Sequence, residues 1–414
     1  MKIINLTQTQ FRNYAQLHKY KTFGQTIEYT HLLENNTLNK LFIGMINDED
    51  DLLAASLFLI REEAPGFKSA YAPNGFLIDY EDTQLVENFI KLSSEYLKRE
   101  KVSYLITNPM FSLKIYNRTN SLIRDNQSFL NTFINNGFKS VGYISPFAKY
   151  DIVINYNDMS SDAYKSFNRN TRRNIKEAMN MGITLHKGTH DDLEEAYKMF
   201  KKKTKHSLNY YHNLMDSYST KDNKMEIFFA RLDPKKFLIN AQKLYNDEKN
   251  RNEQIHNNLK KRIGHISEKL LNKKISSDSL LEKYSQILNY AIKLNSDSTD
   301  YVNVATSIVF HNNNEVYFLI DGYFEKYRQI HANHVLKWAI ISKYQGLGYN
   351  IFNLGEINEN YHDINNKYYG MYLYKIGFGG NIVEYPPMLM LILNKTKYNA
   401  YTKLNKIIPW KKSI

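Results

Sequence analysis

A long polar stretch in the second half of the sequence limits the folds that this chain can adopt. From about residue 235 to residue 295 the chain is rich in Lys, Glu, Asn and Gln, and its sparse apolar residues recur at spacings of three and four. This spacing on both sides of the polar run 272–279 predicts two antiparallel helices packed as a coiled-coil hairpin. A disordered insert is the alternative, and the periodicity within both arms argues against it.

Strands and helices alternate on both sides of this stretch. Apolar runs of strand length predict strands at 41–46, 52–60, 76–80, 102–109, 224–232, 301–312 and 315–323. Helical spacing predicts helices after Asp82, at 128–138, within 167–182, from about 324 to 345, and at 369–376. The acidic run NDEDD between the first two strands predicts the turn of a hairpin. Such alternation is typical of α/β proteins.

The pattern predicts two α/β units with a helical hairpin inserted into the second. The first unit is expected at 1–155, and the second at 156–234 and 297–396. The inserted arm then covers 235–296, and a basic C-terminal segment covers 397–414.

The net charge points to polyanionic partners. The chain has 55 Lys and Arg against 42 Asp and Glu, a formal charge of +13. This favours RNA, anionic lipid or phosphorylated precursors as partners. A solvated lysine-rich surface is the alternative.

Several classes of chemistry are excluded by composition. The chain has no cysteine, which rules out disulfides, thiol nucleophiles and Cys-ligated metals. His206, His212, His331 and His334 lack ligand spacing with nearby acids, so we expect no metal site and no cofactor. No apolar run reaches the roughly 20 residues of a membrane span, and the first residues do not resemble a signal peptide, so a cytoplasmic location is expected.

Lys375 is the first candidate site residue. It lies in LYKIGFGGNIVEY, directly after Tyr374 and before a glycine-rich turn. Lysines are rarely found in apolar company without a partner. This lysine could stabilise a developing oxyanion or bind a fixed phosphate. It could also pack its stem and extend its head to water.

Three further motifs contain charged residues or glycines that a site could use. Arg172, Arg173 and Lys176 fall on one predicted helix, which is either a solvated face or a site for phosphates of RNA. Asp79 lies inside an apolar run and needs either a backbone hydrogen bond or a catalytic role. The glycines of YQGLGYN (344–350) follow a helix and precede a strand, so a helix C-cap is favoured over a phosphate loop. An acyl-CoA donor is therefore not supported.

The order of these motifs resembles one family. The stretches FGQTIEY, PNGFLIDYED, NRNTRRNIKEAMNMGI, YFLIDGYFEKYRQIHANHVLKWAI, YNIFNLGEI and LYKIGFGGNIVEY, in this order, are similar to the Fem family of peptidyltransferases, which extend the cross-bridge of peptidoglycan precursors. The resemblance covers nearly the whole chain. It implies two acetyltransferase-like (GNAT-type) α/β domains and, in some members, a coiled-coil arm.

The resemblance also implies roles for single residues. Lys375 matches the family's active-site lysine and follows Tyr374, where the family has an aromatic residue; Asp79 matches an aspartate after a turn whose family arginine is absent here. Matches to substrate-binding positions are Tyr317, Tyr218, Asn213 and His31. Asn213 falls where relatives have a phosphate-binding arginine, and His31 aligns only loosely with a precursor-binding lysine.

The implied reaction moves glycine, serine or alanine from aminoacyl-tRNA to an amine of a peptidoglycan precursor. That acceptor is a lipid-linked or UDP-linked muropeptide, so peripheral contact with the inner membrane surface and with sister Fem-type enzymes is expected. Arg172, Arg173 and Lys176 are the candidate tRNA contacts. The alternatives are a Fem-like non-catalytic binding protein and an acyl-CoA N-acetyltransferase.

Overall fold

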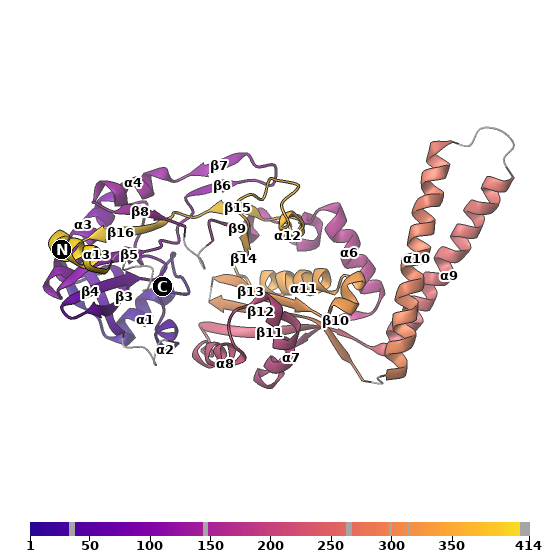
Figure 1. Ribbon diagram of the computed structural model, residues 1–414, viewed down its shortest axis with the longest axis horizontal. Coiled ribbons are helices and arrows are strands. Elements are labelled where there is room, and N and C mark those ends of the chain that lie inside the picture. Colours follow the sequence, from indigo (N-terminus) through magenta and orange to yellow (C-terminus); the bar gives the residue numbers. More distant parts are fainter. Residues whose placement is uncertain (33–37, 144–147, 262–266, 298–299, 313, 406–414) are drawn as a thin grey trace.

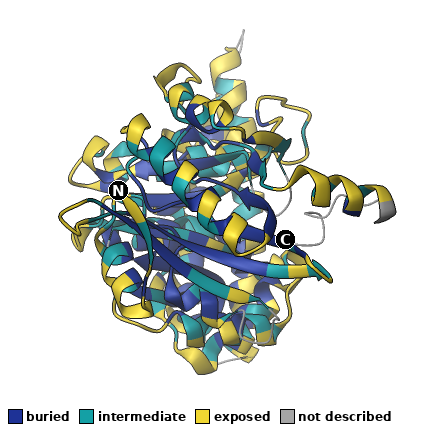
Figure 2. Ribbon diagram, turned by 90° about the vertical axis from the view of Figure 1, so that its left-hand side faces the viewer, coloured by how far each residue is buried: buried dark blue, intermediate teal, exposed yellow. Residues whose placement is uncertain are grey.

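The chain folds around two β-sheets that lie side by side, with a helical arm at one end (Figure 1). This computed structural model describes residues 1–32, 38–143, 148–261, 267–297, 300–312 and 314–405. In the unit nearest the viewer, buried strands fill the centre, while exposed residues concentrate on helices and turns (Figure 2).

The first sheet has seven strands in the order β1-β2-β3-β4-β5-β16-β8. These are β1 (Lys2–Asn5), β2 (Asn39–Ile46), β3 (Leu52–Ala64), β4 (Phe67–Ala72), β5 (Val102–Thr107), β16 (Met388–Ile392) and β8 (Lys139–Gly142). Helices cover both faces. One core packs against α3 (Thr83–Arg99) and α4 (Gln127–Asn135), and the other against α1 (Gln8–Leu17), α2 (Ile27–His31) and α13 (Lys395–Asn405).

The second sheet has nine strands in the order β10-β11-β12-β13-β14-β9-β15-β6-β7. These are β10 (Ile183–Lys187), β11 (Asn223–Leu232), β12 (Val302–Asn312), β13 (Glu315–Tyr323), β14 (Ile351–Ile357), β9 (Tyr150–Asn155), β15 (Asn381–Glu384), β6 (Lys114–Tyr116) and β7 (Leu122–Asp125). Its larger core packs against α5 (Ala163–Ser166), α6 (Arg169–Asn180) and α11 (Ala332–Gly346), and a smaller core on α7 (Leu193–Phe200) and α8 (Leu208–Ser217).

Each sheet contains one parallel pair of strands joined by a helix. In the first sheet α3 connects β4 to β5, and in the second α11 connects β13 to β14. A parallel pair requires such a crossover, whereas the other described pairs are antiparallel. The glycines at 346 and 348 end α11, with Gly348 at φ +80°, so the predicted helix cap is confirmed.

The two sheets exchange strands. Although β6, β7 and β9 precede residue 156, they pair within the second sheet, while β16 returns from the end of the chain to lie between β5 and β8. The division of strands between the two sheets therefore differs from the expected units 1–155 and 156–234 with 297–396. That those ranges fold as separate units stays a prediction. Residues 406–414 of the expected basic segment lie outside the described residues.

The inserted arm consists of two long helices that project away from both sheets (Figure 1). They are α9 (Pro234–Lys260) and α10 (Glu268–Asp297). The predicted turn at 272–279 is wrong, because α10 is continuous through it. Its polar residues instead pair across the helices: Ser277 Oγ donates to Glu248, and Asn252 Nδ2 donates to Asp278 Oδ1 over 2.7 Å.

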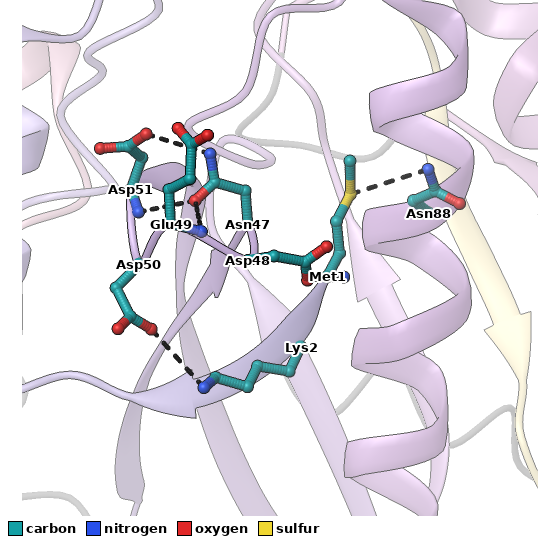
Figure 3. Close-up of polar contacts among 8 residues, drawn as sticks. All are labelled: Met1, Lys2, Asn47, Asp48, Glu49, Asp50, Asp51 and Asn88. Carbon is teal, nitrogen blue, oxygen red and sulfur yellow. Dashed lines mark hydrogen bonds and ion pairs between the residues drawn. The ribbon is translucent and has the colours of Figure 1, made fainter.

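The predicted hairpin β2–β3 is confirmed. Its acidic turn is organised by Asn47, whose side-chain oxygen accepts the amides of Glu49 at 2.9 Å and Asp51 at 2.8 Å (Figure 3). By contrast, the predicted strand 76–80 is wrong, since only Leu77 pairs, in a single bridge with Ala55.

Candidate active site

A cavity of about 770 Å³ lies beside the second sheet. Its walls come from β13, the turn Glu325–Ile330, α11, β14 and α12 (Tyr369–Ile376). The volume is in the range of small-molecule sites. Charged and aromatic side chains line it, among them Lys203, Phe318, Asp321, Lys337, Tyr374 and Lys375.

Lys375 lies in this cavity, at the last turn of α12. Its Nζ donates to the backbone oxygen of Glu356 over 2.7 Å and lies above Gly355, where a Cβ would approach Nζ to 3.5 Å. Burial and the nearby Lys337 ammonium lower the pKa of Lys375 to about 8. A half-buried ammonium with one backbone partner has donors left for an anion in the cavity.

A buried ion pair forms part of the same cavity wall. Lys337 on α11 is 1% exposed, and its Nζ lies 2.7 Å from Asp321 Oδ2 and 3.4 Å from the centre of the Phe318 ring. Ser307 Oγ donates to the other carboxylate oxygen over 2.8 Å. Burial opposes the charge on Asp321, yet the Lys337 ammonium outweighs it and lowers its pKa. The pair fixes a positive and a negative charge beside the cavity.

Aromatic rings complete this wall. Tyr374 donates its hydroxyl to the backbone oxygen of Asn333 over 3.1 Å, and its ring lies 5.6 Å from Lys337 Nζ. The His334 ring packs edge-on against Tyr374 at 4.8 Å. Burial lowers the pKa of His334 to about 3, so this ring is neutral near pH 7.

A second cavity of about 590 Å³ adjoins the first. Both are lined by Arg328 and His331, and the second extends to Ser279, Glu282, Lys283 and Gln286 on α10. Lys283 forms an ion pair with Glu177 of α6 at 2.8 Å. The base of the arm therefore borders the same hollow as the candidate site.

The structure brings Lys375 and Tyr374 into one cavity, whereas the predicted tRNA contacts lie on α6, which packs against α11. On α6, Arg172 donates to the backbone oxygen of Lys165, while Arg173 and Lys176 are exposed. This helix reaches the cavity wall through Asn174, whose side chain contacts His334 Nε2 at 3.2 Å.

Three of the other predicted substrate contacts, Tyr218, Asn213 and His31, lie where α2 meets α8, and Tyr317 lies on β13. Tyr218 is 0% exposed and donates its hydroxyl to the backbone oxygen of Phe23 over 3.1 Å. Tyr317 packs against the same core, and Asn213 and His31 are exposed on α8 and α2. The buried Tyr218 therefore packs within the junction in this structure, and its role as a substrate contact stays a prediction.

Asp79 does not share the cavity with Lys375. It forms an ion pair with Lys19 Nζ at 2.8 Å and accepts the backbone amide of Glu81 at 3.1 Å. Burial raises its pKa, but these two partners outweigh that effect and lower it. Asp79 is therefore poorly suited to act as a general base, because a stabilised carboxylate accepts a proton less readily.

The site residues expected from the sequence do not include Lys337, Asp321 and Lys203, which line the cavity. Lys337 lies in VLKWAI and Asp321 in FLIDGY, so each is a charge inside an apolar run. That signal had singled out Lys375 and Asp79, and it would have found this pair as well. Lys203, in a run of lysines, offered no comparable signal.

Two other features are absent from the described parts of the chain. No group of three or more His, Asp or Glu side chains is placed there to hold a metal ion. Nor does any described helix have the length and apolar character needed to cross a membrane.

Comparison with known proteins identifies the family. The model of the FemAB family matches residues 6–406. The chain belongs to the FemAB family. The resemblance seen in the sequence is thus confirmed.

Relatives and a solved structure match over the full length. The chain is 25% identical to aminoacyltransferase FemB of Staphylococcus epidermidis (strain ATCC 12228 / FDA PCI 1200), covering 98% of this chain and 99% of the relative. It is 24% identical to aminoacyltransferase FemA of Staphylococcus aureus (strain MRSA252), with the same coverage. A crystal structure of FemX superposes with a TM-score of 0.71 at 16% identity, over 98% of this chain and 100% of that one. This FemAB protein therefore has the FemX fold, and the expected α/β class is confirmed.

Proposed function

We propose that this FemAB protein is an aminoacyltransferase of peptidoglycan cross-bridge synthesis. Its full-length relatives bear the name aminoacyltransferase. The donor is an aminoacyl-tRNA carrying glycine, serine or alanine. The acceptor is an amine of a lipid-linked or UDP-linked muropeptide, either on the stem peptide or on a growing bridge.

The observation that carries the proposal is the position of Lys375. Its ammonium lies in a cavity large enough for an aminoacylated nucleoside, beside the fixed charges of Lys337 and Asp321. The cavity wall also has the aromatic rings on which a base can stack. A cation there can meet the oxygen that becomes negative as an ester carbonyl turns tetrahedral.

The reaction is aminolysis of the ester. The acceptor nitrogen bonds to the carbonyl carbon, and the carbonyl oxygen takes the negative charge, which the Lys375 ammonium stabilises. The carbon–oxygen bond to the ribose then breaks, and the ribose oxygen takes the proton that the amine loses. Holding the two substrates together accounts for roughly 7–11 kcal/mol of the barrier, and one donor to the oxyanion adds about 3 kcal/mol.

The acceptor site is assigned to the junction of α2 and α8. Exposed His31 and Asn213 lie there, on the two helices that pack the units together. The junction lies apart from the cavity walls, so the long, flexible muropeptide is expected to bridge the two regions. With a lipid-linked acceptor, the protein contacts the membrane surface through its substrate.

Replacing Lys375 tests the function. Lys375→Ala is expected to reduce single-turnover transfer at least tenfold, since the oxyanion loses its cation. The measurement incubates the protein with a pool of charged tRNAs and lipid-linked precursor, and mass spectrometry identifies the product. The exposed Lys367, on the preceding turn, provides the control variant Lys367→Ala, which should transfer normally.

Near-normal transfer by Lys375→Ala would remove this lysine from the active site. Absence of any product with the unaltered protein, across the whole tRNA pool, would contradict the proposed reaction itself.

A further inference from the structure

We propose that the lysine-rich turn at the mouth of the cavity binds phosphates of the donor's single-stranded 3′ end. The turn consists of Lys201, Lys202, Lys203 and Lys205 and follows α7 directly. The proposal rests on the proposed function and names a nucleic-acid contact separate from the basic face of α6.

The turn is tied to the cavity through Lys203. Its Nζ donates to the backbone oxygen of Asp321 over 3.2 Å and lies 4.9 Å from the centre of the Tyr323 ring. Both partners belong to β13 and, like Lys203, line the cavity. The turn is thus part of the cavity's rim.

Close packing of the backbone holds the turn at this place. A Cβ on Gly322 of β13 would lie 2.7 Å from the carbonyl carbon of Met199 and 2.8 Å from the amide nitrogen of Phe200. The end of α7 therefore presses directly on the strand that carries Asp321, an approach that only glycine allows. Phe200 is itself 0% exposed, which anchors the residue immediately before Lys201.

Hydrogen bonds fix the far side of the turn. Tyr211 donates its hydroxyl to Thr204 Oγ1 over 3.0 Å, and Tyr197 donates to the backbone oxygen of His206 over 3.0 Å. The His206 ring stacks on Tyr210 at 4.0 Å. The backbone is thus held in one shape while the lysine side chains extend outward.

The remaining lysine charges are available to a ligand. Lys201, Lys202 and Lys205 are exposed, and none forms an ion pair with a carboxylate in the parts of the chain that the structure describes. Other exposed lysines, such as Lys198 with Glu194, do form such pairs. Unpaired ammonium groups at the rim of an aromatic cavity fit a ligand that combines phosphates with a stacking base.

This combination favours RNA over a lone diphosphate. A single strand entering the cavity would place its terminal adenosine among Tyr323, Tyr327 and Tyr374, all of which line it. The phosphates of the preceding nucleotides would then pass the turn on their way out. A nucleotide-linked precursor has the same phosphate chemistry, so the experiment includes it as a separate arm.

The test compares two triple variants with equal loss of charge. The first is Lys201→Gln, Lys202→Gln and Lys205→Gln. The control is Lys91→Gln, Lys98→Gln and Lys139→Gln, which changes exposed lysines on α3 and β8 of the first sheet unit. Thermal unfolding of both should match the unaltered protein, because the side chains replaced lie at the surface.

Fluorescence anisotropy then measures binding of a 5′-phosphorylated ACCA oligonucleotide at several salt concentrations. For the first variant we expect a Kd raised at least tenfold and a slope of log Kd against log salt reduced by ~2, as for three lost phosphate contacts on a single strand. The control variant should bind as the unaltered protein does. Transfer from a phosphate-free aminoacyl ester of adenosine should be unchanged in both.

The other possible results contradict either the phosphate site or the proposed function. Equal RNA binding by the first variant and the control would overturn the proposal, as would failure of the unaltered protein to bind the oligonucleotide. If the first variant loses binding of the UDP-linked precursor but keeps RNA binding, the proposal is also overturned, because the turn then binds the acceptor. Normal RNA binding by an unaltered protein that transfers nothing would leave the phosphate site in place and contradict the proposed function.

Discussion

At the scale of single residues, the environment of Lys375 sets the pH range in which its side chain carries a positive charge. Its pKa of about 8 follows from burial and from Lys337 nearby. The free chain holds this proton up to a pKa near 10.5, so between those values the unfolded state binds more protons than the folded one. Stability contributed through this group therefore rises as pH increases across that window.

The same shift predicts the pH dependence of transfer. The ammonium form stabilises the oxyanion, and it is lost as pH rises through about 8. Since the acceptor amine must be neutral to attack, transfer should first rise with pH and then fall, with the descending limb near pH 8. Single-turnover rates, corrected for spontaneous ester hydrolysis, would show this profile.

Lys375→Arg is the matched variant, because guanidinium keeps its charge throughout the range. If this variant retains transfer, its descending limb should move to higher pH. An unchanged limb would mean that some other group causes the fall.

Single site residues could be predicted from the sequence only where the residue type is unusual for its local surroundings. Lys375 stood out because a charge among apolar residues needs a partner, and the structure does place it in a cavity. Its partner is the backbone oxygen of Glu356, which leaves no signal in the sequence. The neighbouring pair of Lys337 and Asp321 could not be inferred either, since the two meet only when α11 packs on β13. Tyr218 matched a substrate contact by position alone, and its complete burial depends on packing between the two units.

At the scale of elements, periodicity predicted most helices and strands, and the errors have physical causes. The polar run 272–279 predicts a turn, but its side chains pair with α9 across the arm. The apolar run 76–80 predicts a strand, although Asn74 and Gly75 adopt positive φ just before it and redirect the chain. Local sequence cannot show which apolar residues fill a core without joining a sheet.

The arm leads to a prediction of its own. Only its base contributes to the core of the second sheet, through Phe237, Ala241, Ile287, Leu288 and others. Replacing residues 250–275 by a short Gly/Ser linker should therefore leave the thermal midpoint within a few degrees of the original. Calorimetry would measure it.

The base provides the contrasting variant. Ile287 is 1% exposed, so Ile287→Ala should destabilise the fold by about 2–5 kcal/mol. Loss of cooperative unfolding in the shortened protein would contradict this division of the arm.

At the scale of the whole molecule, the exchange of strands makes the two sheets depend on each other. Residues 1–143 contain six of the seven strands of the first sheet and lack only β16. That strand lies between β5 and β8, so without it β8 has no partner in the sheet and β5 has an open edge.

We therefore expect the isolated fragment 1–143 not to unfold cooperatively. Fusing residues 386–405 to its end through a flexible linker should restore a cooperative transition, as followed by circular dichroism in urea. A sharp transition in the fragment alone would show that β16 is dispensable. Local sequence could not place β16 in this sheet, because neighbours distant in the chain leave no local pattern.

The late position of β16 also has a consequence for synthesis. A ribosome delivers domains in order, and the earliest one usually folds first. Here the first sheet must wait until residue 392 has left the exit tunnel before the gap between β5 and β8 closes. A chain that ends before β16 is made therefore has an incomplete first sheet, in which β8 has no partner strand.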